Sequence, residues 1–215
     1  MRIGKNNTFI MIGDSVTDCG RKRPEGEDIS TGTGWGDGYV NLVRGQLGAV
    51  YPEYNIRVIN KGNSGEQSGD LLPRWKEDVL DYEPEWVSIL IGINDVWRMF
   101  DSSNIVESHG DQGIYEHNLR TIIEKTLPIT KNIILMAPYF IENSKQDAMR
   151  KEMDAYGLIC KKLAEEYGLF FIDLQAAFDK VLESVHPMYF GWDRIHPNTI
   201  GHTLIANKIL EVIEA

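Results

Sequence analysis

A serine, a histidine and an aspartate in this chain occur in a pattern that could carry out nucleophilic catalysis. Ser15 follows a short apolar run and a glycine, whereas Asp193 lies three residues before His196. A serine hydroxyl becomes a nucleophile when an imidazole takes its proton and a carboxylate fixes the tautomer of that imidazole. One Asp-x-x-His turn could supply both groups, with Asp193 facing Nδ1 and Nε2 left for Ser15. Helix capping is the alternative for each segment taken alone, because serine and aspartate are favoured caps.

Two further segments could donate hydrogen bonds to a developing negative charge. Asn94 follows the apolar run that ends at Ile91, and its side-chain amide could point at an oxyanion. Gly65 lies in a Gly-rich stretch after Asn60, where a glycine lets a backbone N–H approach a bound ligand closely. One such donor stabilises an acyl-transfer transition state by about 3 kcal/mol. Both positions are also explained as ordinary polar turns.

The elements that must position these groups are indicated by the hydrophobic pattern. Short runs rich in Ile, Val and Leu, apolar at consecutive positions, are typical of strands buried on both faces of a parallel sheet. The expected strands are 9–13, 56–60, 86–91, 132–137 and 169–172. Amphipathic stretches predict helices over 38–50, 68–81, 114–127, 147–167 and 199–213. The alternation predicts one domain, residues 1–215, built as a three-layer α/β/α sandwich on about five parallel strands.

The candidate catalytic residues fall at equivalent places in this expected fold. Functional side chains of doubly wound sheets gather at the carboxyl ends of strands. Ser15, Gly65 and Asn94 each follow an expected strand, and His196 precedes the last expected helix. The segments 20–38 and 100–113 lack a regular pattern, and long loops of this kind often line a site. Oligomer contacts are the other role that we consider for these two segments.

The order of these blocks along the chain resembles the SGNH, or GDSL-type, esterase and lipase superfamily. The blocks are Gly13-Asp14-Ser15, Gly65, Gly92-Ile93-Asn94-Asp95 and Asp193-Arg194-Ile195-His196. The resemblance implies the flavodoxin-like fold of that superfamily, with Ser15 as the nucleophile, His196 as the base and Asp193 as its orienting carboxylate. It also implies an oxyanion hole formed by the Ser15 and Gly65 N–H groups and the Asn94 side chain.

Within this superfamily the chain looks most like small intracellular bacterial esterases that remove acetyl groups from xylo-oligosaccharides. The segments 12–21, 92–98 and 192–197 carry this likeness. It implies a carboxylic ester hydrolase whose partner is a small acetylated carbohydrate. One alternative is a lysophospholipase or acyl thioesterase with the same catalytic groups, which would need a long apolar groove. Another is a non-catalytic sugar-binding protein on a hydrolase scaffold.

Four aromatic residues are candidates for substrate binding, since flat rings can support a sugar or shape a small acyl pocket. Trp192 adjoins Asp193, and Trp97 follows the block that contains Asn94. Trp35 lies in the Gly-rich segment, and Tyr139 ends the fourth expected strand. Packing under loops or at subunit contacts explains each tryptophan equally well, and a homo-oligomer is compatible with the resemblance.

Charge and cysteine content exclude some partners and indicate a compartment. The net charge is −10 and the basic residues are scattered, which argues against binding to nucleic acid or to an anionic membrane. The two cysteines, Cys19 and Cys160, lie far apart and predict reduced thiols in a cytoplasm. We find neither the pattern of a secretory signal nor that of a membrane span.

No cofactor is expected. The histidines outside the proposed site show no ligand spacing, so we expect no metal. The Gly-rich run over 32–38 lacks the spacing of a dinucleotide-binding motif and does not follow a strand directly. Cys19 lies four residues after Ser15 but has no dedicated base in the sequence, so we expect it to be a packing residue.

Overall fold

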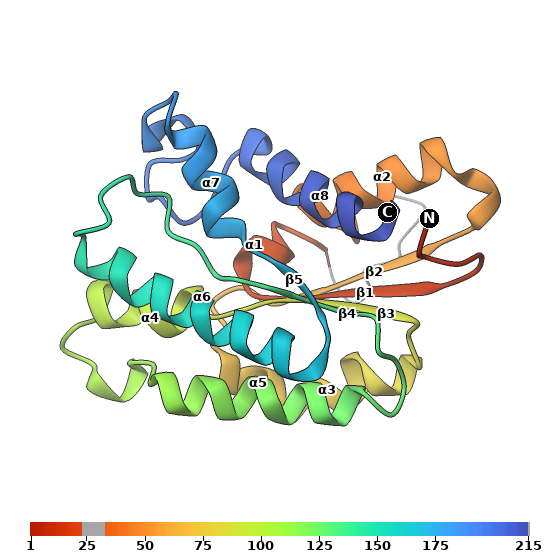
Figure 1. Cartoon of the computed structure of the whole chain (residues 1–215), viewed down its shortest axis with the longest axis horizontal. Coiled ribbons are helices and arrows are strands. Elements are labelled where there is room, and N and C mark those ends of the chain that lie inside the picture. Colours follow the sequence, from red (N-terminus) through yellow and green to blue (C-terminus); the bar gives the residue numbers. More distant parts are fainter. Residues whose placement is uncertain (23–32, 215) are drawn as a thin grey trace.

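The protein is described by a computed structural model that covers residues 1–22 and 33–214. In this part of the chain, five parallel strands form one sheet in the order β2-β1-β3-β4-β5 (Figure 1). The strands are β1 (Thr8–Gly13), β2 (Arg57–Gly62), β3 (Trp86–Leu90), β4 (Ile133–Met136) and β5 (Phe170–Ile172). The five expected strands are therefore confirmed, although β2 continues to Gly62, beyond its expected end at Asn60.

Helices cover both faces of the sheet, which confirms the three-layer sandwich (Figure 1). One layer consists of α2 (Tyr39–Val50), α7 (Leu174–Leu182) and α8 (Thr199–Glu214). The other layer consists of α3 (Leu71–Asp78), α4 (Ile93–Asp101), α5 (Gln112–Thr126) and α6 (Ala148–Tyr167). The four-residue helix α1 (Ser15–Asp18) follows β1 directly. The expected segment 20–38 includes residues 23–32, which lie outside the described part of the chain.

Three α-helices of the described chain, α1, α4 and α7, were not among the expected elements. Helix α7 buries Leu174, Phe178 and Leu182, which recur at four-residue intervals, and the side chain of Asp173 caps it by accepting from Ala176 N–H. Helix α4 occupies a segment that the sequence pattern indicated as a turn followed by a loop. Ile93, Val96, Trp97 and Phe100 recur there at helical spacing, but the helix is only nine residues long and is separated from β3 by only two residues, so it was not recognised from the sequence.

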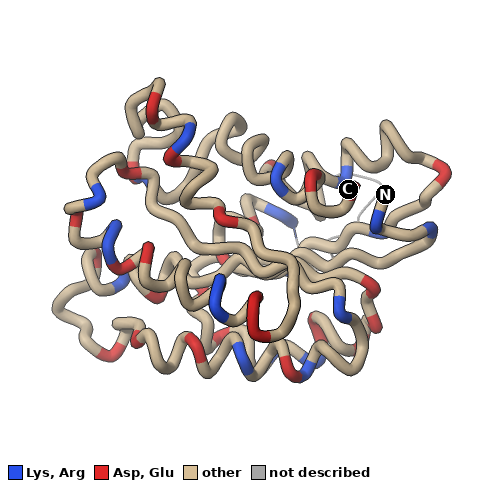
Figure 2. Tube along the Cα trace, in the orientation of Figure 1, with Lys and Arg blue, Asp and Glu red and all other residues tan. Residues whose placement is uncertain are grey.

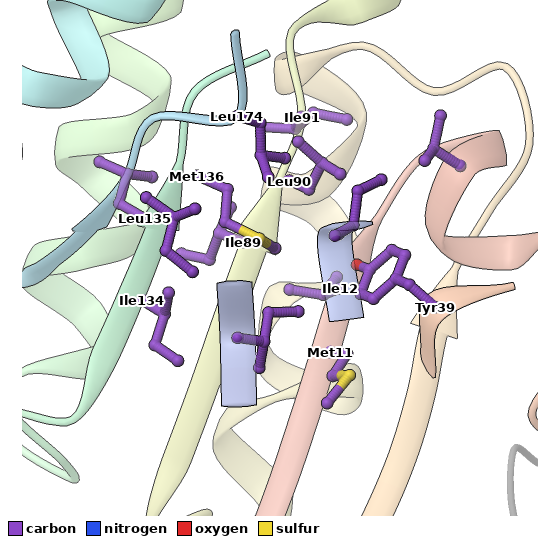
Figure 3. Packing of buried hydrophobic residues seen from close by; sticks show 14 of the residues in the cluster. Met11, Ile12, Tyr39, Ile89, Leu90, Ile91, Ile134, Leu135, Met136 and Leu174 are labelled. Atoms are coloured by element: carbon purple, nitrogen blue, oxygen red, sulfur yellow. The ribbon is translucent and has the colours of Figure 1, made fainter. Parts of the chain in front are cut away.

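The core lies where the central strands meet the helix layers (Figure 3). Every residue of β3 and β4 is buried, as expected for strands that are covered on both faces. Ile12, Ile89 and Met136 are completely shielded from solvent, and burying such a side chain contributes about 1.5–3 kcal/mol each. Tyr39 joins this core from α2, and its hydroxyl lies 2.9 Å from Thr17 Oγ1 in α1. The core thereby reaches the short helix that begins with Ser15.

Charged residues are distributed along both helix layers, with Lys and Arg interspersed among Asp and Glu (Figure 2). The view shows no stripe of basic residues, in agreement with the scatter expected from the sequence. Among the described helices, none combines the length and the apolar character that crossing a bilayer would require.

Candidate active site

Ser15 is positioned by the tight turn that joins β1 to α1. Gly13 ends β1 in register with Leu90 of β3, and a side-chain carbon at Gly13 would collide with the Leu90 carbonyl oxygen. Asp14 then caps α1, since its Oδ1 accepts from Val16 N–H at 2.9 Å. Ser15 is the first residue of α1 and therefore stands at the carboxyl edge of the sheet. In this segment Asp14 therefore caps the helix, and Ser15 is placed where it could react with a substrate.

Ser15, His196 and Asp193 form one continuous hydrogen-bonded chain. Ser15 Oγ lies 2.8 Å from His196 Nε2, and His196 Nδ1 lies 2.7 Å from Asp193 Oδ2. The second oxygen of Asp193 accepts from the backbone N–H groups of Ile195 and His196, each at 2.9 Å. The turn also places Arg194 in the left-handed region, at φ 61°. The structure therefore brings the three expected catalytic residues together, although they span almost the whole chain.

Asp193 is held as a carboxylate. Partial burial raises its pKa, but the hydrogen bonds from the His196 ring and from two backbone N–H groups outweigh this effect and leave the pKa below its usual value. A carboxylate at Nδ1 selects the tautomer that carries hydrogen on Nδ1. Nε2 then has a lone pair available to accept the Ser15 hydroxyl proton.

Three N–H donors expected for an oxyanion hole lie on adjacent segments. The backbone N–H groups of Ser15 and Gly65 donate to no residue in the described part of the chain. Gly65 is exposed and adopts φ +86°, a conformation that favours glycine. Asn94 is 1% exposed, and its Nδ2 donates to the Glu66 carbonyl at 2.9 Å. Because an amide nitrogen carries two hydrogens, this bond leaves one of them for another acceptor.

Two acidic residues hold the Gly65 turn against its neighbours, and the sequence analysis assigned no role to either. Asp18 Oδ2 accepts from the N–H and the hydroxyl of Ser64, at 3.1 and 2.9 Å. On the other side, Asp95 accepts from the Ser68 hydroxyl at 2.6 Å and from Ser68 N–H at 3.0 Å. Burial raises the pKa of Asp95, and the bonds from Ser68 oppose this effect in part. The turn that contains Gly65 is thus fixed to α1 through Ser64 and to α4 through Ser68.

Two of the four proposed aromatic residues lie at this site. The Trp97 ring packs edge-on against the His196 ring, with centroids 5.6 Å apart. Trp192 is 85% exposed and directly precedes Asp193 in the chain.

The other two aromatic residues are structural, which corrects the expectation from the sequence. Trp35 is only 4% exposed, and its Nε1 donates to the carbonyl of Val58, near the start of β2 and away from the catalytic edge. Tyr139 is completely buried and stacks on Phe178. Its hydroxyl donates to Ile195 O at 3.2 Å, so Tyr139 supports the turn that carries His196 and is not accessible to a substrate.

Cys19 and His202 form a second pair near α1. Cys19 Sγ lies 3.3 Å from His202 Nε2, while His202 Nδ1 accepts from Tyr39 N–H. Burial lowers the pKa of His202 to about 4 and raises the pKa of the Cys19 thiol. Near neutral pH the pair is therefore an uncharged imidazole and a thiol, which agrees with a packing role. Over residues 1–22 and 33–214, no group of three or more acidic, histidine or cysteine side chains is arranged to hold a metal ion.

Comparison with known proteins decides the family. The model of the GDSL-like Lipase/Acylhydrolase family matches residues 11–204. The chain belongs to this family. The resemblance carried by the Gly-Asp-Ser, Gly, Asn-Asp and Asp-x-x-His blocks is thereby confirmed.

Individual proteins also match the chain over nearly its full length. It is 50% identical over 213 residues to an acetylxylan esterase of Geobacillus stearothermophilus, a match that covers 99% of this chain and 96% of that protein. The crystal structure of Axe2, an acetylxylan esterase from the same organism, is 49% identical and has a TM-score of 0.96, with coverage of 100% and 97%. LAE5, an α/β hydrolase from the metagenome of Lake Arreo, Spain, is 42% identical with a TM-score of 0.96, covering 100% of this chain and 98% of its own.

Proposed function

We propose that the protein is a serine esterase that removes acetyl groups from xylo-oligosaccharides. The observation that carries this proposal is the chain of contacts from Ser15 Oγ to His196 Nε2 at 2.8 Å and from His196 Nδ1 to Asp193 at 2.7 Å. The 50% identity to an acetylxylan esterase supports the substrate class. Crystal structures of Axe2 catalytic mutants, in which a serine, an aspartate or a histidine is replaced by alanine, support the same three residue types.

The reaction proceeds by two acyl transfers. His196 Nε2 takes the hydroxyl proton as Ser15 Oγ attacks the acetyl carbonyl carbon, whose oxygen becomes negatively charged. The tetrahedral intermediate collapses, the bond from carbon to the sugar oxygen breaks, and His196 returns its proton to that oxygen. Acetyl-Ser15 remains. Water then attacks the acetyl carbon with His196 again as base, and acetate leaves while Ser15 regains its proton.

The negative charge of each intermediate is stabilised by the Ser15 and Gly65 N–H groups and by the Asn94 side chain. These donors are preorganised, because Asp18 and Asp95 fix the Gly65 turn while Glu66 O fixes the Asn94 amide. Fixed donors need no reorganisation when the charge develops, which is why they lower the barrier.

Substrate contact is assigned to Trp97 and Trp192. Trp97 is half-buried beside the His196 ring and suits the wall of a small acyl pocket. Trp192 is exposed beside Asp193 and suits stacking on a sugar ring.

We further propose that residues 1–215 act as one domain and that the protein forms a homo-oligomer. We place it in the cytoplasm, because both of its cysteines are free thiols.

Initial rates on p-nitrophenyl acetate, butyrate and octanoate, together with acetate release from acetylated xylo-oligosaccharides, test the proposal. The blank is Ser15→Ala, which removes only the hydroxyl. We expect a strong preference for acetate, release of acetate from the oligosaccharides, and loss of several orders of magnitude in kcat in the variant. A rate that rises toward octanoate would indicate that the same catalytic residues act on lipid esters or thioesters. The absence of any Ser15-dependent rate would refute the esterase proposal.

A further inference from the structure

The Asn94 side chain is held from both ends of its amide group. Nδ2 donates to Glu66 O at 2.9 Å, and Oδ1 accepts from a guanidinium nitrogen of Arg98 at 3.2 Å. Arg98 lies one turn further along α4, so its side chain reaches back to Asn94 on the same helix face. One neighbour requires a donor and the other requires an acceptor, and together they select a single orientation of the amide.

The orientation of this amide matters because its two ends have similar shape and opposite character. If the group rotated by half a turn, Oδ1 would replace Nδ2 at the position that faces a developing oxyanion. An oxygen lone pair there would repel the negative charge that Nδ2–H stabilises. Glu66 O opposes this rotation from one side. Arg98 opposes the rotation from the other side, because its guanidinium can only donate a hydrogen bond and therefore requires Oδ1 as its acceptor.

Arg98 is itself fixed by two contacts. Its guanidinium forms an ion pair with Asp101 on the same helix, and it lies 4.8 Å from the centroid of the Trp97 ring. Trp97 in turn packs against His196. The Arg98 side chain is 28% exposed, so its charge keeps access to water and needs no buried counter-ion. One arginine of α4 thus contacts both the Asn94 amide and the ring that packs against the base.

We propose that Arg98 is a positioning residue of the oxyanion hole, acting through Asn94 and kept in place by Asp101. The inference rests on the proposed function, because it requires Asn94 to contact the oxyanion. Arg98 also polarises the amide by donating to Oδ1, which makes the remaining Nδ2–H a stronger donor. It contributes to the transition state without contacting the substrate.

The test combines single and double variants in kinetics with p-nitrophenyl acetate. Arg98→Met keeps the length of the side chain but removes its donors, and we expect kcat to fall about tenfold with KM unchanged. Arg98→Lys, which keeps a cation near Oδ1, should recover part of the rate. Asn94→Ala should lower kcat by about 10²–10³-fold. Adding Arg98→Met to Asn94→Ala should cause no further loss, because the arginine then has no amide to position.

Arg120→Met is the matched control. Arg120 is also 28% exposed, pairs with acidic residues and lies 5.5 Å from a tyrosine ring centroid, but it sits on α5 away from the site. We expect its kcat to equal that of the wild type. If Arg98→Met is poorly folded, Asp101→Asn loosens the arginine without removing it and should lower kcat by a smaller factor.

The remaining outcomes overturn the inference in distinguishable ways. A rise in KM at constant kcat would make Arg98 a substrate-binding residue. An equal loss in the presence and absence of Asn94 would show that Arg98 acts through another group. A wild-type kcat for Asn94→Ala would show that neither Asn94 nor Arg98 contributes to the oxyanion hole. A low kcat for Asn94→Ala together with a wild-type kcat for Arg98→Met would keep Asn94 in the oxyanion hole and exclude a role for Arg98.

Discussion

The indole ring of Trp97 lies edge-on to the imidazole of His196, with centroids 5.6 Å apart and ring planes inclined by 66°. The His196 side chain is 42% exposed and is held at its two nitrogens by Ser15 and Asp193, and the contact with Trp97 adds a further restraint on the ring. An aromatic pair of this kind contributes about 0.5–1.5 kcal/mol beyond its buried area. Trp97 therefore restricts the motion of the base relative to Ser15.

Trp97→Ala should accordingly lower kcat by about three- to tenfold, because a misplaced base costs rate even when its chemistry is intact. Trp97→Phe keeps an aromatic edge and should recover most of the loss. Steady-state kinetics with p-nitrophenyl acetate and with acetylated xylo-oligosaccharides provide the measurement. A variant with normal kcat and a raised KM on the oligosaccharides alone would instead assign Trp97 to sugar binding.

Tyr139→Phe should destabilise the protein by about 1–2 kcal/mol, since it leaves the buried carbonyl of Ile195 without its donor. The same change should reduce kcat, because Ile195 immediately precedes His196. Urea unfolding measures the first effect and steady-state kinetics the second. Tyr156→Phe is the control: its hydroxyl is buried without a hydrogen-bond partner in the described structure, so its removal should cost no stability. Equal losses in both variants would show that the bond to Ile195 is unimportant.

The sheet and the edge at which the candidate catalytic residues meet were predictable from the sequence, because both depend on local pattern. Buried parallel strands are apolar at consecutive positions, as β3 and β4 are. Ser15 and Asn94 follow such strands, so the edge at which they meet follows from the parallel topology. Helix α4 does show helical spacing, at Ile93, Val96, Trp97 and Phe100. It was missed because nine residues, separated from β3 by only two, are too few for the pattern to be told from a turn and a loop.

Side-chain direction was the part that the sequence could not supply. Tyr139 follows a strand at the catalytic edge, yet its ring turns into the core against Phe178. Trp35 belongs to a Gly-rich segment near α1, yet its indole packs beside β2 under the guanidinium of Arg44, 3.7 Å from the ring centroid. The contact from Arg98 to Asn94 likewise depends on α4 being a helix, which makes residues four apart neighbours.

Gly13→Ala should prevent normal folding, because the added carbon would collide with the Leu90 carbonyl and with Thr17 Oγ1. Neither neighbour can yield easily, since Leu90 belongs to the central strand β3 and Thr17 to the buried face of α1. Gly45→Ala is the matched control, as an added carbon there meets no atom within 4 Å. It should stabilise α2 by about 0.5–1 kcal/mol. Soluble yield and thermal unfolding measure both, and a stable, active Gly13→Ala would refute the tight approach of β1 to β3.

Asp14 should make stability fall as the pH rises toward neutrality. The carboxyl is completely buried, its Oδ2 has no hydrogen-bond partner among the described residues, and burial raises its pKa from 3.8 to about 7 against the opposing bond from Val16 N–H. In the unfolded chain the carboxyl ionises near its ordinary value. Between these two values the folded state therefore keeps a proton that the unfolded state has released. The contribution of Asp14 is favourable below the unfolded pKa and is lost at about 1.4 kcal/mol per pH unit until the folded pKa is reached.

Asp14→Asn isolates this effect, because asparagine keeps an acceptor for Val16 N–H and cannot ionise. The variant should gain stability relative to the wild type as the pH rises from about 4 to about 7, and the difference should level off above that range. Urea unfolding of both proteins across this range gives the difference directly, and other titrating groups cancel in the subtraction. A difference that does not change with pH would show that Asp14 has the same pKa in the folded and unfolded states. Ionisation of the residue next to Ser15 would then be uncoupled from folding.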